Sequence, residues 1–201
     1  MSDNYITITT LKEIEDPVKT KDKVIQWMQS MEFIEKDLTG CVMDFLAEGY
    51  KPGKNHVIAI GYDEDILSLH VCGLECKTGR NVFNAGAFTA MAKVICPECG
   101  KNRFEGLTPQ DFFDDNCTEE QLILFHDVFP EFHNWTKYEE ATLTCPYCST
   151  ALDVENYRIS KGLSLSNFRM TFWNWPDLTS NFLDVLQTII GTEITRINGH
   201  L

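Results

Sequence analysis

The chain carries the same short motif twice, as Cys-Pro-Glu-Cys-Gly at residues 96–100 and as Cys-Pro-Tyr-Cys-Ser at residues 145–149. In a Cys-x-x-Cys turn both sulfurs point to one side, proline presets the φ of the turn, and glycine permits a left-handed residue after it. Two such knuckles facing each other supply four thiolates to a tetrahedral Zn²⁺ ion. The motifs therefore predict one zinc site with four ligands: Cys96, Cys99, Cys145 and Cys148.

Four sulfur ligands leave no open coordination position on the metal, so the predicted site is structural rather than catalytic. A β-branched stretch precedes each knuckle, at 94–95 and at 142–144, as in a zinc ribbon. Forty-five residues separate Cys99 from Cys145, whereas a compact ribbon has roughly 15–20. The ribbon element, residues 94–150, is therefore expected to hold an insertion. The alternatives are two unrelated turns or two redox pairs, but a redox pair should open a helix and neither motif clearly does.

The apolar pattern outside the knuckles predicts a single α+β domain over residues 1–201, with an antiparallel sheet. Residues 168–176 are apolar on both alternating faces, which is typical of a central strand covered on two sides. Strands are expected at residues 5–11, 56–60, 66–72, 94–95, 141–144, 165–175 and 193–197. Helices are expected at residues 18–36 and 177–190, and from Thr108 and Thr118, the last of these ending near Pro130.

The charge balance limits the partners that the chain can bind. Seventeen Lys and Arg against 30 Asp and Glu give a net charge of −13, which repels nucleic acid and anionic lipid. No stretch approaches the ~18 apolar residues of a membrane-spanning helix, and the N-terminus lacks the basic and apolar regions of a secretory signal. We therefore expect a cytoplasmic protein, not bound to a membrane, whose eight cysteines are reduced or bind metal.

The expected helical insertion, residues 104–136, is strongly acidic. It contains no Lys or Arg and eight acidic residues, so it carries −8 of the −13. Aromatic rings interleaved with charge of one sign suit an interface with a basic protein, since rings anchor and charges steer. The alternative is that the rings pack onto the domain and several acids only occupy helix N-termini. The predicted partner-binding residues are Asp111, Phe112, Phe113, Asp114, Asp115, Glu119 and Glu120.

A second group of candidate ligands, His70, Cys72 and Cys76, is a weaker signal. These residues can form a second metal site or replace one ligand of the first. Alternatively, the two cysteines are a pair of buried thiols at the end of a strand, because cysteine is commonly buried. The spacing alone leaves both interpretations open.

The two knuckles, the acidic spacer, the Trp-Asn-Trp-Pro strand end at 173–176 and the closing helix, glycine, strand and His-Leu tail form a combined pattern. In these features the chain resembles a group of uncharacterised bacterial proteins, from about His70 to the C-terminus. The resemblance implies zinc knuckles and a bacterial origin. It carries over no catalytic residues, because the group has no established activity.

Three functions follow from these features. The first is a non-enzymatic, zinc-stabilised binding protein, such as a bacterial immunity protein that masks a basic, nuclease-type toxin. The second is an enzyme with a generic site of His70, Cys72 and an acid such as Asp63 or Asp65. The third is a nucleic-acid-binding zinc ribbon, which the net charge of −13 opposes. Its cations near the knuckles are few: Lys93, Lys101 and Arg103.

Overall fold

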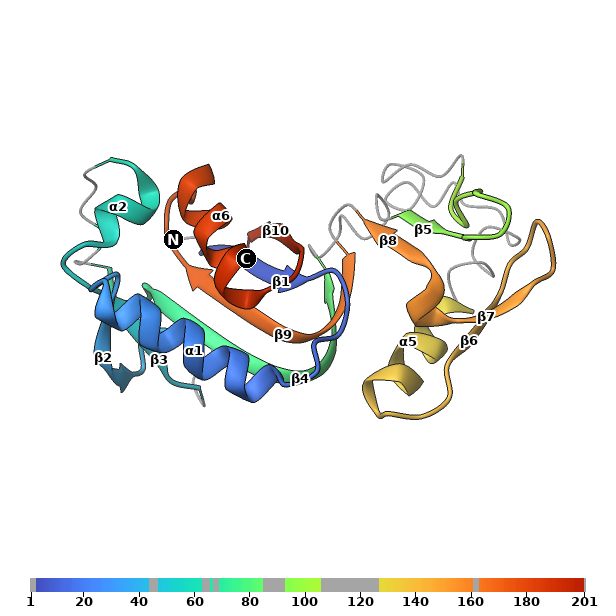
Figure 1. Ribbon diagram of the computed structural model, residues 1–201, viewed down its shortest axis with the longest axis horizontal. Coiled ribbons are helices and arrows are strands. Elements are labelled where there is room, and N and C mark those ends of the chain that lie inside the picture. The colour runs from blue at the N-terminus through green and yellow to red at the C-terminus, as the bar shows by residue number, and fades with distance from the viewer. Residues whose placement is uncertain are drawn as a thin grey trace. The chain divides into compact units, whose positions relative to one another are not determined.

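The computed structural model describes residues 3–43, 47–62, 66, 69–84, 93–105, 127–160 and 163–200. Over these residues the chain is a mixed α+β protein with a large antiparallel sheet, as its sequence predicts (Figure 1). It divides into two compact units. The first unit comprises Met1–Thr10, Ile14–Thr78 and Asn167–Leu201, and the second comprises Leu11–Glu13 and Gly79–Ser166. The sequence analysis expected one domain over 1–201, and the ribbon element at 94–150 lies inside the second unit.

Most of a six-stranded sheet of order β10-β1-β9-β4-β3-β2 belongs to the first unit, whereas residues 79–84 of β4 and 163–166 of β9 belong to the second. The pairs β10–β1, β1–β9, β2–β3 and β3–β4 are antiparallel, and Thr7 of β1 lies opposite both Ile197 and Thr171. The long strand β9 lies between β1 and β4, which confirms the predicted central strand. The strands span β1 Asn4–Thr10, β2 Ile34–Thr39, β3 Gly49–Pro52, β4 Gly73–Asn84, β9 Leu163–Trp173 and β10 Ile194–His200.

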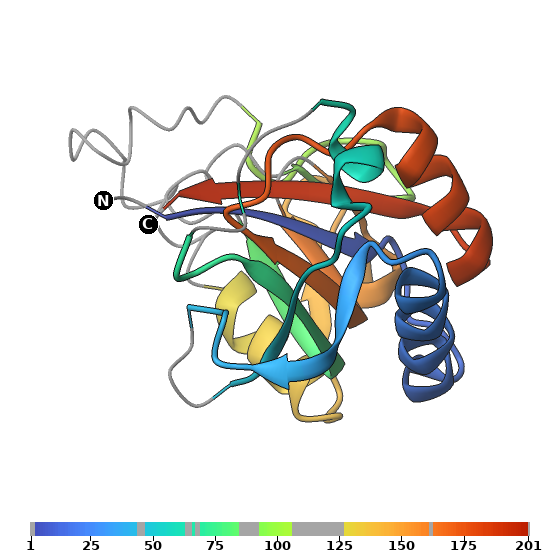
Figure 2. The ribbon, with the colours of Figure 1, turned by 90° about the vertical axis from the view of Figure 1, so that its left-hand side faces the viewer.

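Helices α1 (Pro17–Ser30) and α6 (Ser180–Ile190) pack next to each other in this unit (Figure 2). Both begin at a side-chain cap, because Asp16 accepts a hydrogen bond from the Lys19 N–H and Thr179 from the Phe182 N–H. Gly191, with a left-handed φ of 86°, ends α6 as the sequence predicts. The helices and the sheet share one apolar core, which includes Ile6, Ile8, Val24, Met28, Phe168, Met170, Phe172, Phe182 and Leu186.

The segment from residue 18 to residue 36, expected as one helix, changes direction at Glu32. Helix α1 ends at Ser30, Glu32 takes a left-handed φ of 57°, and β2 starts at Ile34, opposite Pro52. Phe33 and Ile34 follow the helix but are also buried in the core, so their apolar side chains continue the helical pattern in the sequence. The predicted helix was therefore too long by its last six residues.

The two strands expected at residues 56–60 and 66–72 are also wrong. His56–Ile60 form a short helix, α2, which buries His56, Ala59 and Ile60 and ends at the left-handed Gly61. A short apolar run does not distinguish a strand from a buried helix, so pairing and capping decide. The Leu69 N–H donates to the Ile66 carbonyl in a turn, and the strand begins only at Gly73.

The second unit consists of small elements around a separate apolar core. Its strands are β5 (Lys93–Ile95) paired with β8 (Arg158–Ser160), and β6 (Thr142–Thr144) paired with β7 (Ala151–Asp153). It also holds helix α5 (Val128–Thr136) and the 3₁₀ turn η2 (Val154–Asn156). The core includes Val94, Phe104, Val128, Phe132, Trp135, Leu143, Val154 and Tyr157.

Pro130 does not end a helix. It lies in the first turn of α5, where the missing N–H of proline has no helical partner to lose. A helix therefore runs through Pro130, where the sequence analysis expected one to end. The helices expected from Thr108 and Thr118 lie outside the described residues.

Asn174 joins three segments of the first unit, and we expect its replacement to be costly. Its φ is 54°, its side-chain N–H₂ donates to the Val71 carbonyl at 2.8 Å, and its side-chain oxygen accepts from the Asn4 N–H at 2.8 Å. Asn174→Ala should lower the free energy of unfolding by about 2–3 kcal/mol in urea titrations. Asn174→Gly, which keeps the left-handed backbone, should lose about 1 kcal/mol less. Equal losses for the two variants would contradict a contribution from backbone strain.

Candidate metal centre

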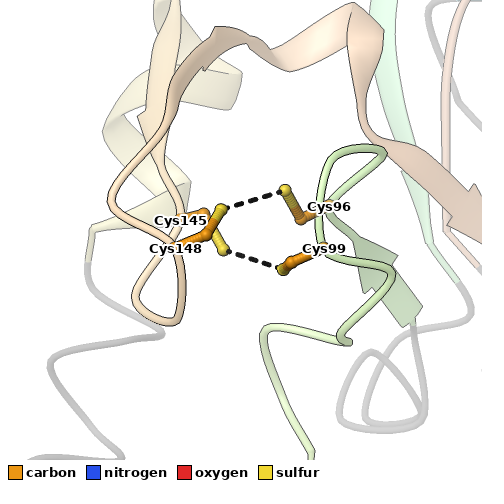
Figure 3. A group of neighbouring side chains, drawn as sticks. All are labelled: Cys96, Cys99, Cys145 and Cys148. Atoms are coloured by element: carbon orange, nitrogen blue, oxygen red, sulfur yellow. Dashed lines mark hydrogen bonds between the residues drawn. The ribbon is translucent and has the colours of Figure 1, made fainter.

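The four predicted zinc ligands come together in the second unit. Their sulfur atoms all lie within 4.8 Å of one another. Cys96 Sγ is 3.8 Å from Cys148 Sγ, and Cys99 Sγ is 3.7 Å from Cys145 Sγ (Figure 3). A disulfide needs about 2.05 Å, so these are four separate thiols. A tetrahedron with metal–sulfur bonds of about 2.3 Å has edges of about 3.8 Å, so the two shortest separations match such a site.

The two knuckles have the same backbone hydrogen bonds. In the first, the Cys96 N–H donates to the Lys101 carbonyl at 3.0 Å and the Gly100 N–H donates to the Cys96 carbonyl at 2.9 Å. In the second, the N–H groups of Cys145 and Ser149 make the equivalent bonds, both at 2.9 Å, to the carbonyls of Thr150 and Cys145. The repeated sequence motif therefore folds into one repeated turn.

Each knuckle ends on a left-handed residue. Gly100 has a φ of 71°, and Ser149, at the same place in the second knuckle, has a φ of 60°. The sequence identified the left-handed step at Gly100. Ser149 has a side chain, so its left-handed backbone conformation is unfavourable. Binding of a metal by the sulfurs would have to outweigh this cost.

Strand β8 explains how the knuckles meet across the long sequence separation. The second knuckle connects β6 to β7, and the chain then passes through η2 into β8, which pairs with β5 immediately before the first knuckle. Val94 lies opposite Ile159 in this pairing. The return of the chain to β5 thus brings the second pair of cysteines to the first.

The ligands differ in their surroundings. Cys96 and Cys145 are buried, whereas Cys99 and Cys148 are exposed. The hydroxyl and backbone N–H of Thr150 lower the pKa of the Cys148 thiol to about 6, because hydrogen bonds stabilise the thiolate. A thiolate at this position at neutral pH favours binding of a metal cation.

The weaker cluster of candidate ligands does not assemble into a second site. His70 is exposed and Cys72 is buried, with its Sγ 4.0 Å from the Asn174 carbonyl. Burial, and secondarily the nearby Cys41, raises the pKa of Cys72 to about 12, and burial also raises that of Cys76 to about 12. Both therefore stay protonated thiols at neutral pH. In the described part of the chain, the four knuckle cysteines form the one group suited to a metal ion.

The predicted partner-binding residues Asp111, Phe112, Phe113, Asp114, Asp115, Glu119 and Glu120 all lie outside the described residues. Their proposed role stays a prediction.

Two of the three cations near the knuckles, Lys101 and Arg103, make contacts within the second unit. Only 4% of the Arg103 side chain is exposed, and its Nη1 donates to the Thr144 carbonyl at 2.7 Å. The Lys101 Nζ lies 4.9 Å from the centre of the Tyr147 ring, which joins the first knuckle to the second. Nothing in the sequence indicates that Arg103 is buried, because its burial depends on contacts with residues more than 20 positions away.

A second feature that the sequence did not reveal surrounds Arg80 in the second unit. The guanidinium pairs with Glu13 at 2.6 Å and Glu155 at 2.9 Å, and it lies over the rings of Trp135 and Tyr138. The Trp135 indole N–H also donates to Glu155 at 2.7 Å. This cluster fixes α5 to η2 and lies outside the metal centre.

Among the residues that the structure describes, no helix is both long and apolar enough to cross a membrane. Comparisons of the chain with protein-family models, with curated proteins and with solved structures found no match. Among the described residues, the four-cysteine cluster is the feature with the clearest chemistry.

Proposed function

We propose that the chain is a non-enzymatic, zinc-stabilised protein that binds and masks a basic protein. The observation that carries this proposal is the closed set of four sulfurs, all within 4.8 Å of one another. A metal ion held by four thiolates has no position for water or substrate, so it supports a fold and does not catalyse.

Zinc is the metal that fits these ligands best. Tetrahedral sites made of four thiolates select zinc or iron–sulfur clusters. The 3.7 and 3.8 Å sulfur–sulfur separations match the edges of a tetrahedron around one ion. The seven described cysteines are free thiols, which agrees with the reducing cytoplasm where we place the protein.

Charge supports a basic partner. The chain has a net charge of −13, and residues 104–136 contain eight acidic residues and no Lys or Arg. The described part of the second unit adds a hollow of about 260 Å³ next to α5. The aromatic side chains of Trp135 and Tyr138 line it, together with the acidic residues Glu139, Glu140, Asp153 and Glu155. Arg80 also lines this hollow, lies over both rings and pairs with Glu155. The carboxylates of Glu139, Glu140 and Asp153 are therefore the ones that can pair with Lys and Arg side chains of a partner.

The mechanism in this proposal is occlusion. The carboxylates at 111–120 pair with Lys and Arg residues that the partner uses to hold phosphate, and the neighbouring rings fill its pockets. A bacterial immunity protein bound to a nuclease-type toxin has this chemistry, because a nuclease needs a basic surface for its anionic substrate. The bacterial origin rests on the resemblance described above.

Reversal of charge in the insertion tests the proposal. The partner would be purified with the tagged protein, identified by mass spectrometry and titrated by calorimetry. The variant Asp114→Lys, Asp115→Lys, Glu119→Lys, Glu120→Lys should bind the partner at least 100-fold more weakly, because each close charge pair contributes about 1.5 kcal/mol or more. It should retain its zinc, since none of the four is a ligand.

A matched control separates local pairing from net charge. Four exposed acids of the first unit, replaced by lysine, change the net charge by the same amount: Asp22, Glu35, Asp37 and Asp184. The control should weaken binding less than fivefold at 0.15 M salt, where long-range attraction is screened. Equal weakening by both variants, or a co-purified partner with an acidic surface, would contradict the proposed masking surface.

A further inference from the structure

We propose that Arg103 is a positioning residue whose guanidinium supplies the counter-charge for the metal centre. This inference rests on the metal centre under the proposed function. A divalent metal with four thiolates carries a net charge of −2, and that charge lies partly inside the second unit because Cys96 and Cys145 are buried. A buried anion needs a neighbouring cation or hydrogen-bond donors to remain charged.

The backbone places Arg103 at the centre. It follows Cys99 by four residues, and its N–H donates to the Val94 carbonyl at 2.8 Å, two residues before Cys96. This bond closes the hairpin that carries the first knuckle, together with the Ile95–Asn102 bridge. The position of Arg103 is therefore fixed by the same turn that fixes two of the sulfurs.

The side chain of Arg103 reaches the second knuckle. Its Nη1 donates to the carbonyl of Thr144, the residue before Cys145, at 2.7 Å, and its side chain is only 4% exposed. Its Nη2 lies 3.4 Å from Asp127, whose side chain is 59% exposed. One buried guanidinium thus bridges the supports of both knuckles.

Tyr157 provides a second link to the strand that leads into the second knuckle. Its hydroxyl donates to the Leu143 carbonyl at 3.0 Å, two residues before Cys145. Burial raises the pKa of Tyr157 to about 12, with Cys96 and Cys145 acting in the same direction and Arg103 opposing them. Arg103 and Tyr157 thus hold the carbonyls of Thr144 and Leu143, the two residues that lead into Cys145.

Two variants separate the charge of Arg103 from its hydrogen bonds. Arg103→Lys keeps the positive charge and loses the planar fork, whereas Arg103→Gln keeps an N–H donor and loses the charge. Arg80→Met serves as the control, since Arg80 is another paired arginine of the same unit, bound to Glu13 and Glu155 and not to the knuckles. The affinity for Zn²⁺ would be measured on the full chain by competition with a chromophoric chelator.

Arg103→Gln should weaken zinc binding about 10- to 100-fold, the range for residues that support metal ligands from outside. Arg103→Lys should stay within about fivefold of the unchanged protein, and Arg80→Met should leave the affinity unchanged even where it lowers the melting temperature. In the Co²⁺-loaded protein, Arg103→Gln should move the thiolate-to-cobalt band to longer wavelength, because the sulfur electrons lose a neighbouring positive charge.

The outcomes distinguish the inference from the proposal on which it rests. If the unchanged protein binds neither Zn²⁺ nor Co²⁺, the proposed metal centre is wrong. If it binds one ion but Arg103→Gln and Arg103→Lys weaken binding equally, Arg103 is only a structural link and the inference is overturned. The same holds if Arg103→Gln destabilises the metal-free and metal-loaded chains equally, because the affinity then does not change.

Discussion

Loss of the metal is expected to unfold the second unit and leave the first unit folded. The strands that carry the knuckles, β5, β6, β7 and β8, have three residues each, and small sheets of this kind are marginal alone. Structural zinc contributes an apparent 10–16 kcal/mol in small zinc-binding peptides, which is as large as the total stability of a typical domain. The unit should therefore depend on its metal.

Cys145→Ser tests this dependence without a chelator. Cys145 is buried at the end of β6, and serine cannot replace a thiolate in a four-sulfur site. We expect zinc to fall from one ion per chain to below 0.1, and limited proteolysis to cut within residues 79–166. Amide resonances of the first unit should keep their dispersion. Treatment of the unchanged protein with a strong chelator should give the same pattern.

Cys72→Ser is the matched control. Cys72 is a buried cysteine of the first unit, so the substitution places a hydroxyl in an apolar core and destabilises that unit. The variant should keep one zinc ion per chain. If Cys145→Ser retains its zinc, if it unfolds both units together, or if elemental analysis finds iron in place of zinc, the proposed centre is contradicted.

Phe182→Ala is expected to be the most damaging core substitution in α6. The ring of Phe182 packs against Trp27 and Phe33, each at 5.5 Å between ring centres, and against Phe172 at 6.2 Å. It therefore joins α1, the segment before β2, and β9. Removal of a buried phenylalanine costs about 3–5 kcal/mol, from lost burial and the cavity left behind. Urea unfolding followed by tryptophan fluorescence should show this loss, since three of the four tryptophans, Trp27, Trp173 and Trp175, belong to the first unit.

Val185→Ala, one turn further along α6, is the control for Phe182. The Val185 side chain is 47% exposed, so its truncation should change the free energy of unfolding by less than about 0.5 kcal/mol. Neither substitution should change the zinc content, because both residues belong to the first unit. A loss below 1 kcal/mol for Phe182→Ala would show that the three ring contacts do not hold the helix to the sheet.

The sequence predicted the metal ligands because the chemistry of a Cys-x-x-Cys turn is local. Two cysteines three positions apart, with proline between them, are oriented by the turn itself. The end of helix α6 was predictable for the same reason, since Gly191 provides it, whereas the predicted start at Asp177 lies three residues before Ser180, the first residue after the Thr179 cap. The central position of β9 followed from side chains that are apolar on both faces.

Long-range contacts decided the features that the sequence did not reveal. Residues 56–60 form helix α2, which buries His56, Ala59 and Ile60 without pairing to a strand. Arg103 is buried because the Thr144 carbonyl lies beside it, 41 residues further along the chain. No local pattern contains such information.

The sequence by itself determined the donor set, Cys96, Cys99, Cys145 and Cys148, and the acidic character of the segment between the knuckles. Only the tertiary structure decided that β8 returns to β5 and brings the sulfurs together, and which segments make up each of the two compact units. The physical reason is that turn geometry and charge belong to neighbouring residues, whereas strand pairing and burial depend on which distant segments lower the free energy by meeting.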